Sequence, residues 1–337
     1  MHYRGIHRFH AALEAAGRHA TTSGSMAHST LKDVSGMQQI SLGKGPTSSR
    51  LIYGCMRIAG DGSDPALERG RRALQAALDA GFTTFDHADI YGGGRCEELF
   101  GGYLGKNNKL RDELTLITKC GIVFADDDGP KRYDSSAAHI NAQVERSLAR
   151  LRTERIYLLL LHRPDPLMEA EDVAAAFSAL RTAGKVANFG VSNFSPSQVR
   201  LLQNACDVPL CVNQVEINFP RLDALYDGTL DQCQSRQMTP LAWSPLAGVV
   251  YPVEESRLSA ACARSLEVEL ERQAHAAGVE PWVVALAWLL RHPAGIVPIV
   301  GSTTPERIAA ATTALDRNVS RTDWYRLLEA RNGSAVP

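Results

Sequence analysis

The sequence has no run of about 20 consecutive apolar residues, which is the length that a membrane-spanning helix needs. It also has no excess of charge of either sign, because 36 Lys and Arg residues are balanced by 37 Asp and Glu residues. A net charge near zero gives no electrostatic preference for nucleic acid or for an anionic membrane surface. We therefore expect neither as a partner.

Cysteine pairing motifs are absent as well. The seven cysteines include no Cys-x-x-Cys pair, and most of them lie inside apolar runs. An odd number of scattered cysteines favours reduced core thiols over disulfides, and with them a cytoplasmic protein. No second His or Cys stands at ligand spacing from His162, so no metal site is expected.

The N-terminal segment 1–36 lacks the continuous apolar core of a secretory signal, and its acids are Glu14 and Asp33. We expect it to be a disordered extension and exclude it from the fold prediction. Two origins stay open. The arginines among small residues are typical of organelle targeting, whereas an upstream start would leave Met26 or Met37 as the true initiator.

With 45% hydrophobic and 22% charged residues, the chain can bury a large core. After residue 37, aliphatic runs alternate with amphipathic stretches, which is the pattern of βα units around a parallel sheet. The eight expected strands are Leu51–Cys55, Thr83–Asp86, Leu114–Lys119, Ile156–Leu161, Ala187–Val191, Cys211–Val215, Thr239–Trp243 and Ile296–Val300. The expected helices are 64–80, 95–105, 135–152, 170–183, 196–205, 223–236, 257–277 and 281–292.

No linker divides the region 37–337, so the sequence predicts one α/β domain, a (β/α)8 TIM barrel. A doubly wound open sheet is the competing topology. Its Gly-x-Gly-x-x-Gly fingerprint is missing after the first strand, and Gly92-Gly93-Gly94 follows the second strand without that spacing.

Polar or aromatic residues end successive predicted strands. In a parallel barrel these ends share one face, which carries the active site. Each residue also has a structural interpretation when taken alone, such as a turn for an aspartate or a buried core position for a tryptophan. Together they predict one site; the strand-end residues are Asp86, Lys119, His162, Asn193, Gln214 and Trp243.

Asp86, Tyr91, Lys119 and His162 together suit the delivery of a proton to a carbonyl oxygen. We expect Asp86 to hold Lys119 charged, Lys119 to lower the pKa of the Tyr91 phenol, and His162 to orient the substrate. Such a site supplies an acid but no reductant, so a hydride-donating cofactor is required.

Three ordered motifs resemble the aldo-keto reductase superfamily, and closely its bacterial members of the YdhF type. They are Gly81 to Gly92 (GFTTFDHADIYG), Ile117 to Gly121 (ITKCG) and Leu159 to Pro166 (LLLHRPDP). The resemblance covers nearly all of 37–337 and implies a catalytic tetrad of Asp86, Tyr91, Lys119 and His162, with Tyr91 as the general acid.

The resemblance also implies NADP as the cofactor. It places Ser192, Asn193 and Gln214 on the nicotinamide amide and Trp243 on the nicotinamide ring, whereas the pyrophosphate and the adenosine phosphate meet Ser244, Leu246, Gly248, Gly301, Ser302, Thr303 and Arg307. The chain departs from much of the family at this end. Gly301 stands where many members have a phosphate-binding lysine, and Ala310 and Ala311 replace a Glu-Asn pair. Arg307 is then the expected reader of the 2′-phosphate.

These features predict an NADPH-dependent reductase of aldehydes or ketones, expected to act as a monomer on a small molecule. The alternative is a nucleotide-binding regulatory subunit, because potassium-channel β subunits resemble this fold and keep the tetrad. The substrate stays open, since loops 122–134 and 218–228 and the tail after 320 complete the pocket without a recognisable pattern.

Overall fold

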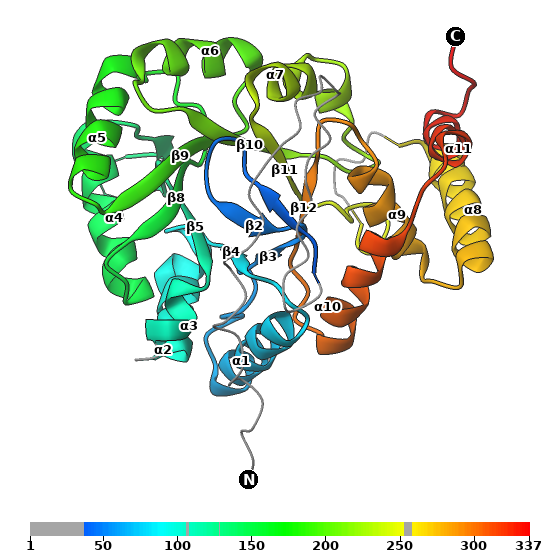
Figure 1. Ribbon diagram of the computed structural model, residues 1–337, viewed down its shortest axis with the longest axis horizontal. Helices are drawn as coiled ribbons and strands as arrows, with labels where there is room; N and C mark the ends of the chain where they lie inside the picture. Colours follow the sequence, from blue (N-terminus) through cyan, green and yellow to red (C-terminus); the bar gives the residue numbers. More distant parts are fainter. Residues whose placement is uncertain (1–36, 106–107, 128, 253–257) are drawn as a thin grey trace, which may run out of the picture.

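The barrel is closed and parallel. The computed structural model describes residues 37–105, 108–127, 129–252 and 258–337, and the expected extension 1–36 lies outside this part. Eight strands pair in the order β10-β11-β12-β3-β4-β5-β8-β9 and are surrounded by helices (Figure 1), which confirms the predicted (β/α)8 fold. The strands are β3 (Ile52–Gly54), β4 (Thr84–Asp86), β5 (Thr115–Cys120), β8 (Ile156–Leu161), β9 (Val186–Ser192), β10 (Leu210–Glu216), β11 (Thr239–Trp243) and β12 (Val297–Val300).

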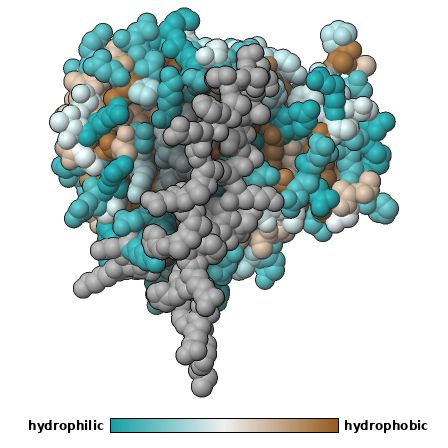
Figure 2. Space-filling view, viewed as in Figure 1, coloured by the Kyte–Doolittle hydropathy of each residue, from teal (hydrophilic) through white to brown (hydrophobic). Residues whose placement is uncertain are grey.

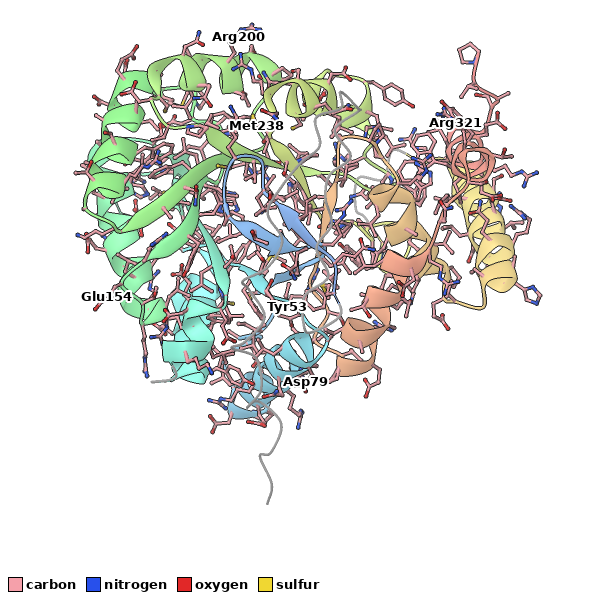
Figure 3. The ribbon with its side chains drawn as sticks, viewed as in Figure 1. Tyr53, Asp79, Glu154, Arg200, Met238 and Arg321 are labelled. Atoms are coloured by element: carbon pink, nitrogen blue, oxygen red, sulfur yellow. The ribbon has the colours of Figure 1, made fainter. Side chains whose placement is uncertain are left out.

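Aliphatic side chains fill the barrel and the layer between strands and helices, because strands covered on both faces bury alternate residues on each side. Leu158, Leu160 and Leu241 belong to the interior cluster. Tyr53 of β3 lies in the middle of the molecule, whereas Asp79, at the end of α1, lies at its edge (Figure 3). The Tyr53 hydroxyl donates a hydrogen bond to the carbonyl oxygen of Ser302 at 2.9 Å, which ties β3 to the segment after β12.

Helices cover the outside of the barrel and begin and end largely where the sequence predicts. Ser195 opens α6 with a reciprocal capping box, and Gly184 follows α5 with a left-handed backbone. The helices are α1 (Asp64–Asp79), α2 (Arg95–Leu104), α3 (Asn108–Asp112), α4 (Ala137–Leu151), α5 (Ala170–Thr182), α6 (Pro196–Ala205), α7 (Thr229–Arg236), α8 (Ala260–Ala277), α9 (Pro281–Leu290), α10 (Pro305–Ala311) and α11 (Arg321–Asn332).

One predicted helix is too long. The expected helix 223–236 begins at Thr229, because Gly228 has a φ of 86° and interrupts the helical backbone. A single 3₁₀ turn over Asp223–Leu225 precedes it.

The sequence prediction also omits several elements, among them α3, the small hairpin of β6 (Ile122–Val123) and β7 (Arg132–Tyr133), a second hairpin and the last helix. The hairpin of β1 (Gln39–Ser41) and β2 (Thr47–Ser49) closes the amino-terminal end of the barrel, where Thr115 of β5 donates a hydrogen bond to the carbonyl oxygen of Thr47. The tail after 320 forms α11, which lies against α8 (Figure 1). The hairpin of β1 and β2 lies away from the carboxyl ends of the barrel strands.

All seven cysteines are free thiols, which confirms the expectation of reduced cysteines. Six are buried and Cys262 is partly exposed. Burial raises the pKa of the Cys55 and Cys120 thiols well above their ordinary value, so both are held in the protonated form.

The surface of the outer helices is mainly hydrophilic on the face shown in Figure 2, with apolar residues in small groups between polar ones. Exposed apolar side chains such as Leu167 and Tyr226 belong to separate loops. Within the described ranges, no helix is both long and apolar enough to span a bilayer.

Candidate active site

A large cavity of about 1180 Å³ opens at the carboxyl ends of the barrel strands. Asp86 ends β4, and Tyr91 begins the short 3₁₀ turn Tyr91–Gly94 that follows it. His162 comes directly after β8. These three side chains line the cavity, and Lys119 of β5 lies fully buried beneath them. The structure thus brings together all four predicted catalytic residues.

Lys119 connects the carboxylate and the phenol. Its ammonium donates hydrogen bonds to Asp86 Oδ2 at 2.8 Å, to Tyr91 Oη at 3.1 Å and to the carbonyl oxygen of His87 at 2.7 Å. Burial lowers the pKa of Lys119, but the Asp86 carboxylate and Tyr91 outweigh that effect and leave the pKa above its ordinary value. Lys119 is therefore a permanent cation beside the phenol oxygen.

The ionisation of Tyr91 differs from the sequence prediction. Burial raises the pKa of the phenol, and although Lys119 lowers it as expected, the net pKa stands above 10. The predicted lowering by Lys119 is present, but it does not set the net pKa, because desolvation of the phenolate outweighs the nearby cation. Tyr91 is fully protonated at neutral pH and therefore holds a proton to donate.

His162 is neutral. Burial, then Lys119 and Arg163, lowers the pKa of its imidazole to about 2. Its ring meets that of Tyr91 edge-on with centroids 5.9 Å apart. Within the described residues, His162 Nδ1 is buried without a hydrogen-bond partner. A neutral imidazole beside the phenol provides one N–H donor for a substrate oxygen.

The turn that carries Tyr91 is fixed from behind by a buried polar cluster. Glu97 accepts a hydrogen bond from Thr118 Oγ1 at 2.7 Å and pairs with Arg150 at 3.4 Å. Arg150 also donates to the carbonyl oxygen of Asp89 at 3.3 Å. Burial and the Glu97 carboxylate raise the pKa of Asp89 to about 7. The cluster holds the backbone two residues before Tyr91 and so positions the phenol.

The residues expected at the nicotinamide end form a connected network. The Gln214 side chain donates to Asp86 Oδ1 at 2.8 Å. The main-chain carbonyl oxygen of Gln214 accepts from Ser192 Oγ at 2.8 Å. Asn193 donates to Ser192 Oγ at 2.8 Å and accepts from the Trp243 ring nitrogen at 3.0 Å. All four side chains line the cavity beside the tetrad.

Two residues that directly follow barrel strands have a strained backbone. Asn193 and Ser244 have φ values of 62° and 49°, a left-handed conformation that costs free energy for residues with a side chain. They follow β9 and β11 directly, where the chain turns away from the barrel. The surrounding hydrogen bonds, such as that from Asn218 to the carbonyl oxygen of Ser244 at 3.1 Å, maintain this conformation.

The residues expected along the pyrophosphate and the adenosine phosphate lie at the other end of the same cavity. Ser244, Leu246, Gly301, Ser302, Thr303 and Arg307 line it. Gly248 does not. Its φ is 76°, and a Cβ there would lie 2.5 Å from Pro220 Cγ, so this glycine is required by the packing of its turn.

Several lining residues lie outside the sequence prediction. Arg57 and Tyr251 line the end near Gly301, and Arg163 and Lys131 line the wall together with His162. The strand-end argument applies to Arg57, which comes shortly after β3, and to Arg163, which follows His162. Tyr251 and Lys131 lie in loops without a recognisable pattern. No cluster of metal-ligating side chains occurs in the described ranges.

The fold and this constellation define a class: a barrel oxidoreductase that places a phenol, a lysine, a carboxylate and an imidazole beside a dinucleotide-sized cleft. The family model for the aldo/keto reductase family matches residues 50–332. The chain therefore belongs to the aldo/keto reductase family.

Three relatives span the barrel. The chain is 43% identical to the uncharacterised oxidoreductase YcsN of Bacillus subtilis, with 89% of this chain and 100% of that protein covered. It is 41% identical to a 6-dehydroglucose reductase of Agrobacterium fabrum, with the same coverage. It is 39% identical to the oxidoreductase YdhF of Escherichia coli, with 87% and 97% covered.

A solved structure shares the fold. An aldo/keto reductase from Klebsiella pneumoniae in complex with NADP and acetate superposes with a TM-score of 0.71 at 24% identity, covering 88% of this chain and 94% of that one.

Proposed function

We propose that this protein reduces an aldehyde or ketone to an alcohol at the expense of NADPH, with Tyr91 as the general acid. The observation that carries the proposal is the 3.1 Å contact between Lys119 Nζ and Tyr91 Oη in the wall of the cavity. Lys119 donates in this contact, so the hydroxyl hydrogen of Tyr91 stays available to a substrate oxygen.

Each of the four protein groups has a separate role in the reduction. When bound, NADPH supplies the hydride that becomes attached to the carbonyl carbon. The carbonyl oxygen takes the proton of Tyr91 Oη, and the phenolate left behind is stabilised by the Lys119 ammonium. Asp86 keeps Lys119 charged through the 2.8 Å ion pair. Neutral His162 donates its N–H to the same substrate oxygen and orients it.

The cavity wall fits the cofactor. The Trp243 ring is partly exposed beside Asn193, as expected for a flat surface that holds a nicotinamide ring. Toward the other end, Arg307 is exposed at the start of α10 and, within the described residues, has no carboxylate partner. We propose that Arg307 meets the 2′-phosphate, and that Ser302 and Thr303 lie beside that phosphate.

For the substrate, we propose an aldehyde with several hydroxyl groups, such as an oxidised sugar. A relative that is 41% identical reduces 6-dehydroglucose, according to its name. The substrate end of the cavity also contains Arg163 and Lys131, whose donors suit hydroxyl oxygens. A panel of sugar aldehydes, simple aldehydes and ketones, monitored by NADPH absorbance, tests this class. A preference for simple ketones would contradict it.

Residues 37–337 form the catalytic domain in this proposal, which we expect to act in the cytoplasm as a monomer on a small molecule. A near-neutral charge and separate exposed apolar residues support this expectation. Size-exclusion chromatography with light scattering tests the oligomeric state.

Replacing Tyr91 by phenylalanine tests the general acid. We expect Tyr91→Phe to lower kcat for reduction by about 10²- to 10⁴-fold, because the proton donor is lost while the ring still packs. Cofactor affinity, measured by fluorescence titration, should change little. Stopped-flow reduction at saturating NADPH is the measurement, and near-native turnover of the variant would contradict the assignment. A wild-type protein that binds NADPH tightly and turns over no carbonyl would favour the regulatory-subunit alternative.

Replacing Arg307 tests cofactor choice. We expect Arg307→Ala to weaken NADPH binding by about 10- to 100-fold, since a charge-assisted phosphate contact stabilises by about 1.5 to 3 kcal/mol. NADH binding should stay nearly constant because NADH lacks the 2′-phosphate. Fluorescence titration of both dinucleotides provides the comparison. An equal loss for NADH would mean that Arg307 supports the loop instead of the phosphate.

A further inference from the structure

Arg57 is a cation in the wall of the cofactor cleft that the sequence prediction does not include. It lies in the loop between β3 and α1, is exposed, and lines the cavity. Its Nη1 donates a hydrogen bond to the carbonyl oxygen of Gly301 at 3.4 Å, and its guanidinium carbon lies 5.5 Å from the centre of the Tyr251 ring. Arg57 thus connects the loops that follow β3, β11 and β12.

Gly301 makes room for this guanidinium. A Cβ added at Gly301 would lie 3.3 Å from Arg57 Nη1, closer than side-chain carbons ordinarily approach a neighbour. The backbone of Gly301 has no left-handed φ, so backbone conformation does not explain the glycine. The space that a side chain at 301 would enter is instead occupied by the end of Arg57. The resemblance implies a phosphate-binding lysine at this position, and the structure places a cation there from the loop after the neighbouring parallel strand β3.

Among the residues that the structure describes, no carboxylate forms an ion pair with Arg57. Glu280 and Glu306 also line the cavity, but neither forms an ion pair with Arg57 in the described ranges. A guanidinium has five N–H donors, and the bond to Gly301 uses one of them. An exposed guanidinium beside a cleft, held by a carbonyl oxygen and an aromatic ring, is a binding group for an anion.

We infer that Arg57 binds the pyrophosphate of the cofactor and replaces the cation that position 301 lacks; this inference rests on the proposed use of NADPH. The pyrophosphate is the favoured anion because Arg57 lies between Gly301 and Tyr251, and Tyr251 belongs to the segment that continues from Ser244 and Leu246. Arg307 lies farther along the chain, on α10. The two arginines therefore have separate tasks: Arg57 meets the phosphates common to NADH and NADPH, and Arg307 meets the phosphate found in NADPH alone.

Because the two arginines meet different phosphates, substituting them should affect the binding of NADPH and NADH differently. Arg57→Ala should weaken the binding of NADPH and of NADH by the same factor, about tenfold for an exposed charge-assisted contact. Arg57→Lys should recover part of the affinity because the positive charge stays. Arg307→Ala is the matched control, with a loss confined to NADPH. Fluorescence titration of the three variants with both dinucleotides gives six dissociation constants, which are compared with those of the wild-type full chain. Thermal melting confirms that each variant is folded.

A charge exchange tests the role of position 301 directly. In Arg57→Ala, the space beside Gly301 is vacated, so the double variant Arg57→Ala/Gly301→Lys can place an ammonium there. We expect Gly301→Lys in this background to raise the affinity for both dinucleotides by at least half of the factor by which Arg57→Ala lowers it. Gly301→Lys in the presence of Arg57 should not improve binding, because the guanidinium already occupies the space.

The outcomes separate the inference from the proposed function. Unchanged affinity in Arg57→Ala, or a loss for NADPH alone, would overturn the assignment of Arg57 to the pyrophosphate. A failure of Gly301→Lys to restore binding would overturn the replacement of one cation by the other. A wild-type protein that binds neither dinucleotide would instead contradict the proposed function.

Discussion

The charge state of each tetrad residue follows from the balance between burial and its neighbours. Lys119 and Asp86 are both buried and stabilise each other's charge across 2.8 Å. His162 faces two cations, Lys119 and Arg163, and no carboxylate is among the causes of its shift. It therefore loses its proton, and the site contains one cation near the phenol instead of two. That arrangement leaves two neutral donors, the phenol and the imidazole, in the wall of the cavity.

This balance predicts the pH profile of reduction. The pKa of His162 is lowered to about 2, so the imidazole is already neutral at pH 5 and does not change its charge on the way to pH 8. We therefore expect His162 to contribute no step to kcat/KM for reduction between about pH 5.5 and 7.5. An imidazole with an ordinary pKa near 6.5 would instead change its protonation within this range.

The measurement is steady-state reduction at saturating NADPH across that pH range. Well above that range, activity should fall where Tyr91 loses its proton, because burial raises the pKa of the phenol above its ordinary value of 10. A step in kcat/KM near pH 6.5 that disappears in His162→Gln would contradict the neutral imidazole.

The sequence predicts the positions of the tetrad, because the ends of parallel strands meet at one face whatever the side chains between them. It does not predict the net pKa of Tyr91, since that value depends on how much surrounding protein covers the phenol. Arg57 escapes prediction for another reason. Its significance depends on Gly301, which is distant in the chain and becomes its neighbour only when β3 pairs with β12.

At the level of the elements, the contact between α2 and α4 depends on one glycine. A Cβ at Gly101 would lie 2.2 Å from the carbonyl oxygen of Arg150 and 2.7 Å from the carbonyl carbon of Leu151. Both are backbone atoms of α4 or its end, so a side chain at this position forces the helices apart. Gly102, the next residue of α2, is exposed and a Cβ there meets nothing within 4 Å.

The two glycines give a matched pair of substitutions. We expect Gly101→Ala to lower the free energy of unfolding by about 1 to 3 kcal/mol, because the helices must separate to admit the methyl group. Gly102→Ala should raise it by about 0.5 to 1 kcal/mol, since alanine loses less conformational entropy in a helix. Urea denaturation of both variants is the measurement, and similar effects of the two substitutions would contradict the close contact.

Most elements follow from local pattern, and the exceptions have physical causes. The strands are recognisable because both faces are buried, which leaves uninterrupted runs such as Ile156–Leu161. The predicted helix 223–236 includes Gly228, and the pattern of apolar residues does not reveal that this glycine turns the chain. The hairpin Gln39–Ser49 is short and polar, and it is stabilised by tertiary contacts such as the bond from Gly43 to Thr239 Oγ1 at 2.8 Å.

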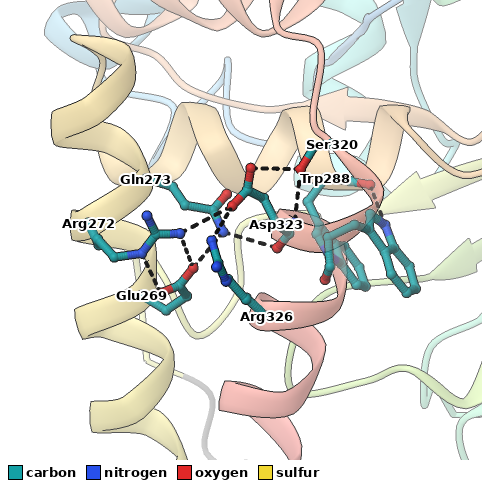
Figure 4. A network of polar contacts seen from close by, with 8 residues as sticks. Glu269, Arg272, Gln273, Trp288, Ser320, Asp323 and Arg326 are labelled. Carbon is teal, nitrogen blue, oxygen red and sulfur yellow. Dashed lines mark hydrogen bonds and ion pairs between the residues drawn. The ribbon is translucent and has the colours of Figure 1, made fainter.

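At the scale of the molecule, the C-terminal helix α11 joins parts that are distant in the chain. Asp323 accepts from Arg272 of α8 at 3.2 Å and from Arg326 at 3.1 Å, and Gln273 donates to the carbonyl oxygen of Asp323 (Figure 4). Near the end of α11, Arg331 donates to the carbonyl oxygen of Phe219 at 2.7 Å. The helix therefore supports the loop of Phe219 and Pro220, against which Gly248 packs.

Two tryptophans attach α11 to the barrel. Trp288 of α9 and Trp324 stack with ring centres 4.7 Å apart and planes at 7°, and each ring nitrogen donates to the other residue's carbonyl oxygen, at 3.0 and 3.2 Å. Offset stacking of large rings stabilises beyond the area it buries.

We expect Trp324→Ala to lower the free energy of unfolding by about 2 to 3 kcal/mol, less than for a fully buried tryptophan because Trp324 is partly exposed. The emission of Trp288 should shift to the red as water reaches its ring. Thr322→Ala, at an exposed position of the same helix, is the control and should change stability by less than about 0.5 kcal/mol. Chemical denaturation with fluorescence detection measures both, and an equal response of the two variants would contradict the role of the stacked pair.

Six of the seven thiols are buried, so the rate at which each is alkylated reports the local opening of the structure around it. Alkylating reagents reach Cys262 from solvent, whereas the other six react when the surrounding element opens, so each labelling rate measures a local opening equilibrium. These cysteines lie between the end of β3 and α7, and mass spectrometry of partially alkylated protein therefore maps stability over this part of the barrel without any substitution; they are Cys55, Cys96, Cys120, Cys206, Cys211 and Cys233.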